Sequence, residues 1–211
     1  MKKYNNIIFD FDGVIMNSHI IKTNAFYYVF SKYGKNIGNY AVKLHIKKMG
    51  MPRTNKFNLI NKYYLNNNLK KKDLNKIEKI FKDYVLKKIF KMKINKNLLK
   101  FIKNSKNKNF YISTGTNQEE IKKICKKMKI SKYFSEIFGS PKTKIMHINS
   151  IIRNYKIKKN DILFVGDSLS DYNAAKYCGI NFICKSNSEN KSLFKNFKVK
   201  RIYKFLQLYN F

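Results

Sequence analysis

The pattern of apolar and polar positions divides the chain into three parts. Residues 6–11 form a short, nearly continuous apolar run, which is typical of a strand buried on both faces. Between residues 17 and 92 apolar positions recur at helical spacing, and no strand pattern is present. From residue 95 onward, short apolar runs alternate with helical stretches, as in a chain of βαβ units.

The individual elements can be placed from these patterns and from the Gly, Pro and Asn breaks between them. The middle part predicts helices over residues 17–34, 39–49, 55–66 and 72–92. The last part predicts strands at 110–113, 137–138, 162–165 and 180–184, helices at 97–103, 118–129, 143–155 and 169–178, and one more short strand and helix.

A helical block of this length is too long for one crossover within a parallel sheet. We therefore expect an α/β fold with two domains. A doubly wound, Rossmann-like parallel sheet core would comprise residues 1–16 and 94–211. A helical cap domain, residues 17–93, would be inserted after the first strand.

The charge of the chain is extreme. Lys and Arg number 46 against 12 acids, which gives a formal net charge of +34 and points first to nucleic acid or an anionic membrane surface. However, the lysines are spread along the whole chain, only three basic residues are arginines, and Asn, Ile, Tyr and Phe are abundant. This set is typical of a very AT-rich genome, so we favour compositional drift over a nucleic-acid partner. The scarcity of acids leaves selection for a basic surface open.

Cysteine usage and hydropathy bear on the compartment. Cys125, Cys178 and Cys184 form no C-x-x-C pair, so reduced, buried thiols are expected rather than a disulfide framework or a zinc site. Asp10 and Asp12 interrupt the N-terminal apolar run, which excludes a signal peptide, and no apolar run is long enough to span a bilayer. We expect a cytoplasmic protein without a membrane partner, either a monomer or a homodimer.

The first strand ends in two aspartates. Asp10 and Asp12 are separated by one residue and followed by Gly13. Burial of unpaired charge is costly, so these residues belong where the strand opens to solvent or a cation, and ligand sites of open α/β sheets lie at this end of the strands. In an extended segment both carboxylates point the same way, so that one can act as a nucleophile while its neighbour handles protons. The alternative is an exposed acidic pair without function.

A second acidic pair follows a later strand. The chain has seven aspartates, and four of them fall at or just beyond the ends of two predicted strands. Asp167 would end its strand, and Asp171 would lie one helical turn further, so both can face one point. Helix capping is the alternative for this pair. Together with Asp10 and Asp12, the pair predicts an oxygen-rich site of the kind that holds Mg²⁺.

The remaining strand ends have groups that would bind an anion, in contrast to the acids that would bind a cation. Thr114 has a hydroxyl group, and Gly115 and Thr116 bring backbone N–H groups to the start of a helix, which together would cradle an anion. Lys144 lies at a helix start, where it opposes the helix dipole. A cation is needed to balance a phosphoryl group beside four carboxylates, and Lys144 and the nearby Lys142 are the candidates.

Taken in order, these segments resemble the four motifs of the haloacid dehalogenase superfamily of phosphatases and phosphomutases. The matching segments are residues 10–14 (DFDGV), 113–116 (STGT), 139–144 (GSPKTK) and 165–171 (VGDSLSD). The helical insert after the first motif is similar to the alpha-helical C1 cap subclass, and the chain most resembles its phosphoglycolate-phosphatase-like hydrolases. Residues 50–57 (GMPRTNKF) resemble a cap segment of that group.

The resemblance implies a role for each matching residue. Asp10 would attack phosphorus and form an aspartyl-phosphate, and Asp12 would protonate the leaving oxygen and then activate water. Mg²⁺ would be held by Asp10, the backbone carbonyl of Asp12 and Asp167, with Asp171 in support. The phosphoryl oxygens would be bound by Thr114, Gly115 and Lys144. Arg53 and Lys56 would face the site from the cap; the alternative is that they are solvated cations at a helix start.

The resulting expectation is a Mg²⁺-dependent phosphatase acting on a small phosphorylated metabolite, a phosphosugar or a phospho-organic acid. Asp12 argues against a dehalogenase, because a halide leaving group needs no proton. One alternative is a sugar phosphomutase of the beta-phosphoglucomutase type, whose cap histidine corresponds here to Lys22.

Two further alternatives come from other classes. One is a polynucleotide-end phosphatase that uses the basic surface. The other is a non-catalytic scaffold, against which the intact acids, Thr114 and Lys144 argue. His19, His45 and His147 show no metal-binding spacing and receive no role.

Overall fold

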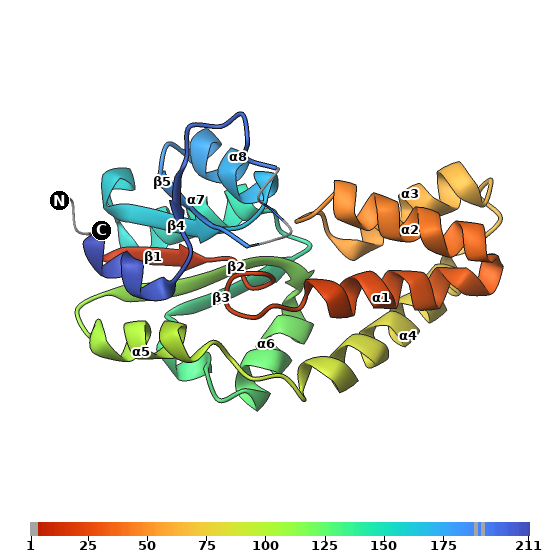
Figure 1. Cartoon of the computed structure of the whole chain (residues 1–211), viewed down its shortest axis with the longest axis horizontal. Coiled ribbons are helices and arrows are strands. Elements are labelled where there is room, and N and C mark those ends of the chain that lie inside the picture. Colours follow the sequence, from red (N-terminus) through yellow and green to blue (C-terminus); the bar gives the residue numbers. More distant parts are fainter. Residues whose placement is uncertain (1–3, 188–189, 191–192) are drawn as a thin grey trace. The chain divides into compact units, whose positions relative to one another are not determined.

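A six-stranded, wholly parallel sheet forms the centre of the first of two compact units, which comprises Met1–Asn17 and Lys93–Phe211 in the computed structural model (Figure 1). The structure describes residues 4–187, 190 and 193–211. The strand order is β3-β2-β1-β4-β5-β6, so the chain builds one side of the sheet first and then crosses to the other. This reversal of winding direction lies next to β1, at the place where open α/β sheets bind ligands.

The elements of this unit alternate along the chain as the sequence pattern predicts. The strands are β1 (Asn6–Phe9), β2 (Asn109–Asn117), β3 (Glu136–Ser140), β4 (Ile162–Gly166), β5 (Asn181–Lys185) and β6 (Lys200–Ile202). The helices are α5 (Lys96–Asn104), α6 (Gln118–Lys127), α7 (Lys144–Tyr155) and α8 (Leu169–Cys178), with a 3₁₀ helix η4 (Phe205–Asn210) near the C-terminus.

Strand register brings the ends of three strands together. Phe9 at the end of β1 pairs with Ile112 of β2 on one side and Val165 of β4 on the other. The amide of Asp10, the next residue, donates a hydrogen bond to the carbonyl of Val165 at 3.0 Å. Residues that follow β1, β2 and β4 therefore meet at one edge of the sheet.

Both faces of the sheet are buried, which explains the continuous apolar runs in its strands. On one face Ile8 belongs to a core cluster with Ile148 of α7 and Ala175 of α8. On the other face the ring of Phe9 lies 6.0 Å from that of Phe110 and 6.4 Å from that of Phe205, measured between centroids. Figure 1 shows α5 on the opposite side of the sheet from α7 and α8.

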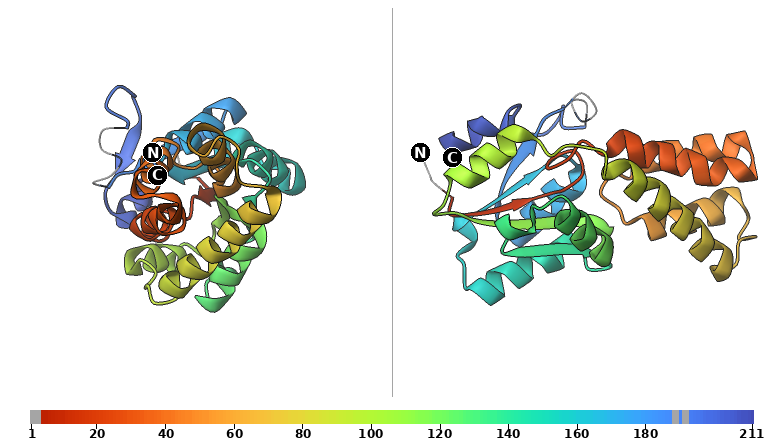
Figure 2. Two further views of the ribbon diagram at one scale, coloured as in Figure 1. Left: turned by 90° about the vertical axis from the view of Figure 1, so that its right-hand side faces the viewer. Right: turned by 90° about the horizontal axis from the view of Figure 1, so that it is seen from below.

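The second compact unit, Ser18–Met92, contains helices and no strand (Figure 2). The structure describes every residue of this unit. Its helices are α1 (His19–Phe30), α2 (Lys35–Lys47), α3 (Arg53–Tyr64) and α4 (Lys71–Ile89). Phe26, Phe57 and Phe81 form its centre, with their rings edge to face and centroids 5.1–5.5 Å apart. This geometry is the preferred one for aromatic pairs and adds to the stability gained from burial.

The predicted fold class, a doubly wound parallel sheet with helices, is confirmed. The clearest differences are that β2 extends to Asn117 instead of ending near Ser113, and that α2 begins at Lys35 instead of residue 39. Gly34, with φ at 125°, makes the early start of α2 possible, because it ends the short 3₁₀ helix η1 (Ser31–Tyr33) that follows α1 and leads the chain directly into α2. The predicted domain limits lie one residue from those of the compact units, and the action of the helical unit as a cap stays a prediction.

Two further expectations can be compared with the structure. Cys125, Cys178 and Cys184 are free and buried, and burial raises the pKa of the Cys125 thiol to about 12, which makes it a poor nucleophile. Among the described residues, no helix has both the length and the apolar composition that a bilayer crossing requires.

Candidate active site

Asp10 occupies the position directly after β1 and is buried. Its Oδ1 accepts a hydrogen bond from the Phe11 amide at 2.7 Å, and its Oδ2 lies 3.0 Å from Nζ of Lys144. Asp12 lies in the turn that follows, where the amide of Gly13 donates to the Met16 carbonyl at 2.7 Å. Gly13 has φ at 77°, a conformation that costs glycine little and other residues much more.

Lys144, the first residue of α7, is a buried cation between two carboxylates. It forms ion pairs with Asp10 and with Asp171. Burial by itself lowers the pKa of Lys144, but the two carboxylates outweigh burial and raise the pKa above its usual range. The ammonium group is therefore charged, and its pairing explains a lysine at a helix start. Lys142, the competing candidate, is exposed.

Asp171 caps a helix and also pairs with Lys144, and its support of a metal ion stays a prediction. One oxygen pairs with Lys144. The other accepts hydrogen bonds from the Asp167 amide at 3.2 Å, the Ser168 amide at 3.0 Å and the Ser168 hydroxyl at 2.6 Å, so it closes a capping box at the start of α8. The turn leaves no space for a larger residue at Gly166, because a Cβ there would collide with the Asp171 side chain.

The buried acids have the chemistry of a metal site. Asp10, Asp167 and Asp171 each place one carboxylate oxygen within 4.8 Å of the others. Burial raises the pKa of Asp10 well above its ordinary value; Asp171, Asp167 and Asp12 raise it further, and Lys144 opposes them. The ammonium group of Lys144 alone therefore does not offset the cost of charging Asp10. Hard carboxylate oxygens that lie this close together fit a divalent cation such as Mg²⁺.

The end of β2 is irregular where the predicted anion site begins. Its pairing with β3 shifts register between Ser113 and Asn117, so the intervening residues leave the regular ladder. Thr114 is buried, and its Oγ1 accepts a hydrogen bond from the Thr116 amide at 3.2 Å. The prediction that the Thr116 N–H is aimed at an anion is therefore wrong in this structure.

The backbone N–H groups at the start of α6 also have a hydrogen-bond partner, the side chain of Asn117. Asn117 Oδ1 accepts hydrogen bonds from the amides of Glu119 at 3.0 Å and Glu120 at 3.3 Å. These are the N–H groups that an anion would use at a helix N-terminus. Of the predicted cradle, the Thr114 hydroxyl and the Gly115 N–H stay as candidate phosphate ligands.

His147, for which the residue spacing indicated no role, links β2 to β3. Its Nδ1 lies 2.9 Å from the Ser113 hydroxyl and its Nε2 lies 3.2 Å from the Gly139 carbonyl. A carbonyl only accepts, so Nε2 carries the proton and Nδ1 accepts from Ser113. Burial lowers the pKa of His147 from 6.5 to about 4, despite the hydrogen bond to Gly139. His147 is therefore neutral at pH 7 and fixes Ser113, the residue before Thr114.

This histidine should make the protein less stable in mild acid. The unfolded chain binds the imidazole proton below about pH 6.5 and the folded chain only below about pH 4, so neutral His147 contributes its full stability above pH 6.5 and loses it as the pH falls toward 4. We expect a loss of about 2 kcal/mol in the free energy of unfolding between pH 7 and pH 5 from this residue. Urea unfolding of wild type and His147→Gln at both pH values measures it. An equal loss in the variant would assign the effect to other groups.

Asp167 is held by two asparagines that the sequence did not single out. Asn190 Nδ2 donates to the Asp167 carbonyl at 3.0 Å, and Asn187 Nδ2 donates to Asp167 Oδ2 at 3.4 Å. Both residues follow β5, and ligand sites of open α/β sheets lie at the carboxyl ends of strands, so their position in the fold is the signal that could have identified them. Their residue type gave no signal, because asparagine is common throughout this chain.

Arg53 and Lys56 lie in α3 of the helical unit, and each has partners within that unit. Arg53 Nε lies 3.2 Å from Oε1 of Glu78. Lys56 is only 3% exposed, with Nζ 3.0 Å from Nδ1 of His45. The alternative that Lys56 is a solvated cation is therefore wrong. A role of Arg53 and Lys56 in substrate binding stays a prediction.

Comparisons with known proteins agree with this geometry. The sequence profile described as haloacid dehalogenase-like hydrolase matches residues 7–185, a range that includes β1 through β5. No curated protein matches the chain by sequence.

Several solved structures have the same fold. A haloacid dehalogenase-like family hydrolase from Streptococcus pneumoniae is 21% identical with a TM-score of 0.75, covering 100% of this chain and 99% of that one. A predicted phosphoglycolate phosphatase from Haemophilus somnus is 18% identical with a TM-score of 0.71, covering 87% and 86%. CbbY from Rhodobacter sphaeroides, solved with xylulose-(1,5)-bisphosphate, is 14% identical with a TM-score of 0.74, covering 96% and 95%. At these identities the likeness shows the fold alone.

Proposed function

The chain belongs to the haloacid dehalogenase-like hydrolases, and from this premise we propose that it is a metal-dependent phosphatase acting on a small phosphorylated metabolite. The observation that carries the proposal is the buried Asp10–Lys144 pair beside Asp167 and Asp171. A buried carboxylate held by a charged lysine, next to further acids, has the composition of a site that receives a phosphoryl group and a cation together.

In the first step, a carboxylate oxygen of Asp10 attacks the phosphorus of the substrate. An O–P bond forms to Asp10 as the ester P–O bond breaks, and the leaving alkoxide takes a proton from Asp12. Asp12 suits this role because it lies two residues after Asp10, in the turn beyond β1. The products of this step are an alcohol and the aspartyl-phosphate.

In the second step, Asp12 acts as a base. It removes a proton from water as the water oxygen attacks phosphorus, and the P–O bond to Asp10 breaks. Inorganic phosphate leaves, the Asp10 carboxylate is regenerated, and Asp12 is protonated for the next cycle. Lys144, with the Thr114 hydroxyl and the Gly115 N–H, would stabilise the phosphoryl oxygens in both steps.

A divalent cation fits the acids that surround Asp10. Asp10 and Asp167 would hold it by their carboxylates, with the backbone carbonyl of Asp12 as the ligand that the family resemblance adds. Asp171 would support the site indirectly, because its oxygens engage Lys144 and Ser168. A cation held by these residues would supply positive charge that offsets the repulsion between the Asp10 carboxylate and the phosphoryl group.

The family and two relatives that share the fold support a proposal for the substrate class. One solved relative holds a sugar bisphosphate, and another is a predicted phosphoglycolate phosphatase. A phosphosugar or a phospho-organic acid is therefore the proposed substrate, and Arg53 and Lys56 of the helical unit are proposed to contact its non-reacting part.

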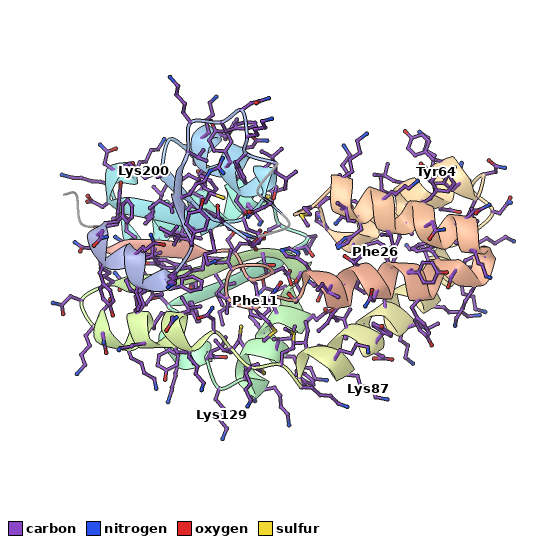
Figure 3. The ribbon with its side chains drawn as sticks, viewed as in Figure 1. Phe11, Phe26, Tyr64, Lys87, Lys129 and Lys200 are labelled. Carbon is purple, nitrogen blue, oxygen red and sulfur yellow. The ribbon has the colours of Figure 1, made fainter. Side chains whose placement is uncertain are left out.

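The basic charge does not favour a polynucleotide substrate. Figure 3 shows lysine side chains projecting from both units, and the exposed Lys87, Lys129 and Lys200, labelled there, come from α4, from the turn after α6 and from β6. Charge distributed over the whole surface indicates composition, whereas a nucleic-acid site gathers its lysines along one groove.

Phosphate release from a panel of small phosphosugars and phospho-organic acids, in Mg²⁺ and in EDTA, tests the proposal. We expect release in Mg²⁺ that EDTA lowers by at least about 100-fold, because several kcal/mol of charge stabilisation are lost with the cation. The ranking of the panel identifies the substrate class. A folded protein that releases phosphate from no compound in Mg²⁺ would overturn the phosphatase.

A further inference from the structure

One hydroxyl group in this site has no role in the mechanism described so far. Thr116 is buried at the irregular end of β2, and its Oγ1 donates a hydrogen bond to Oδ2 of Asp12 at 3.2 Å. We propose that Thr116 is a positioning residue that holds the Asp12 carboxylate in the orientation needed for proton transfer. The inference rests on the proposed function, because it concerns the acid–base residue of that reaction.

The direction of the hydrogen bonds around Thr116 follows from proton counting. A carboxylate only accepts, so the single hydroxyl proton of Thr116 is directed to Asp12. Without substrate, Thr116 Oγ1 accepts from the Thr114 hydroxyl, which lies 3.4 Å away, and Thr114 Oγ1 accepts from the Thr116 amide at 3.2 Å. A bound phosphoryl oxygen would take the Thr114 proton in place of Thr116 Oγ1 and would leave the hydrogen bond from Thr116 to Asp12 unchanged. An ordered chain of hydroxyl groups therefore leads from the proposed phosphate-binding residue to the proposed acid.

The backbone fixes the position of Asp12 but not the rotation of its carboxyl group. Two backbone hydrogen bonds close the turn around it, from Gly13 to Met16 at 2.7 Å and from Met16 to Phe11 at 3.0 Å. Neither of these bonds involves the side chain. Thr116 comes from a separate strand of the same compact unit and contacts one particular oxygen of the carboxylate.

That choice of oxygen matters for the reaction. With Oδ2 accepting from Thr116, the proton to be transferred is carried on Oδ1, and the carboxyl group is held against rotation. General acid–base catalysis requires the proton within hydrogen-bond reach of the reacting oxygen, so a freely rotating carboxyl group would be less effective. Threonine suits the position because it is β-branched and has few rotamers.

Thr116→Val tests the proposal, because valine keeps the shape and removes the hydroxyl group. Thr116→Ser is the matched control, because it keeps the hydroxyl group and removes the methyl group. With an alkyl phosphate, we expect valine to lower kcat by about 10- to 100-fold at unchanged KM, and serine to stay within about threefold of wild type. A structural role would lower the urea midpoint instead, so unfolding is measured on all variants.

An aryl phosphate separates the two steps. p-Nitrophenolate leaves without a proton, so in rapid mixing Thr116→Val should release about one nitrophenolate per enzyme at nearly the wild-type rate. The following turnover needs Asp12 as a base and should be slow. A burst that is followed by slow turnover marks a defect in proton transfer, and general damage to the site slows both phases.

Three outcomes would overturn the proposal. They are a wild-type kcat in Thr116→Val, an increase in KM alone, and a serine variant as slow as the valine variant. If Thr116→Val does not fold, Thr116→Ala replaces it and must show the same loss of kcat with the burst retained. A wild-type protein inactive on alkyl and aryl phosphates in Mg²⁺ would overturn the proposed function itself, which distinguishes that failure from a failure of the Thr116 role.

Discussion

Replacing Asp10 by asparagine is expected to lower the rate of phosphate release by at least about 10⁴-fold, because the nucleophile is lost and water alone does not replace it. The amide has the size and shape of the carboxylate, and its Oδ1 can still accept from the Phe11 amide. Phosphate release in Mg²⁺, measured on the best substrate of the panel, gives the result. Rate loss of less than tenfold would rule out Asp10 as the nucleophile.

The same substitution should leave the fold intact. Burial and the neighbouring acids raise the pKa of Asp10, so its charge is costly in the folded protein, and a neutral amide removes that cost. We expect the free energy of unfolding in EDTA to be no more than about 1 kcal/mol below that of wild type. Added Mg²⁺ should stabilise wild type more than Asp10→Asn, because the variant has lost one proposed ligand.

Lys144→Met should cost both stability and activity. The substitution keeps an unbranched side chain but leaves Asp10 and Asp171 buried without their shared cation. Breaking a buried ion pair from one side costs about 3–5 kcal/mol, and loss of a charged group that stabilises the phosphoryl oxygens costs about 10²- to 10³-fold in rate. Urea unfolding in EDTA and phosphate release in Mg²⁺ measure the two effects.

Lys142→Met is the control for Lys144→Met. It removes the same charge two residues away, from an exposed position, and should change stability by less than about 0.5 kcal/mol. Equal effects of the two substitutions would contradict the specific role of Lys144. A stable Lys144→Met protein in EDTA would show that the acids tolerate the loss of their partner by taking up protons.

The sequence was sufficient to predict that the acids of the candidate site lie together, because each acidic pair interrupts or ends an apolar run. Asp10 and Asp167 each follow an apolar run, and strand ends of a parallel sheet meet at one edge, so two motifs far apart in sequence could be placed together. The structure brings Asp10 and Asp167 together, and it shows that Lys144 pairs with Asp10 whereas Lys142 is exposed. Composition could not distinguish the two lysines in a chain with 46 basic residues.

Features that depend on side-chain partners could not be predicted in this way. Asn117 satisfies the start of α6, and His147 joins Ser113 to Gly139, because particular side chains come within hydrogen-bond distance after folding. Asparagine is too common in this chain to indicate such a contact, and the three histidines show no spacing that would indicate one. The register shift after Ser113, which places Thr114 and Thr116, likewise depends on the neighbouring strand and not on the local sequence.

The central position of β1 determines when a nascent chain can become active. Asn6 pairs with Asn109 on one side and with Ile162 on the other, so β1 is synthesised before both of its neighbours and is completed only by segments made much later. Residues 18–92 contact mainly one another and have those partners available by residue 92. Until β4 has emerged, the apolar first strand stays unpaired on that side and is a natural target for chaperones. Activity therefore reports that translation has passed the fourth strand.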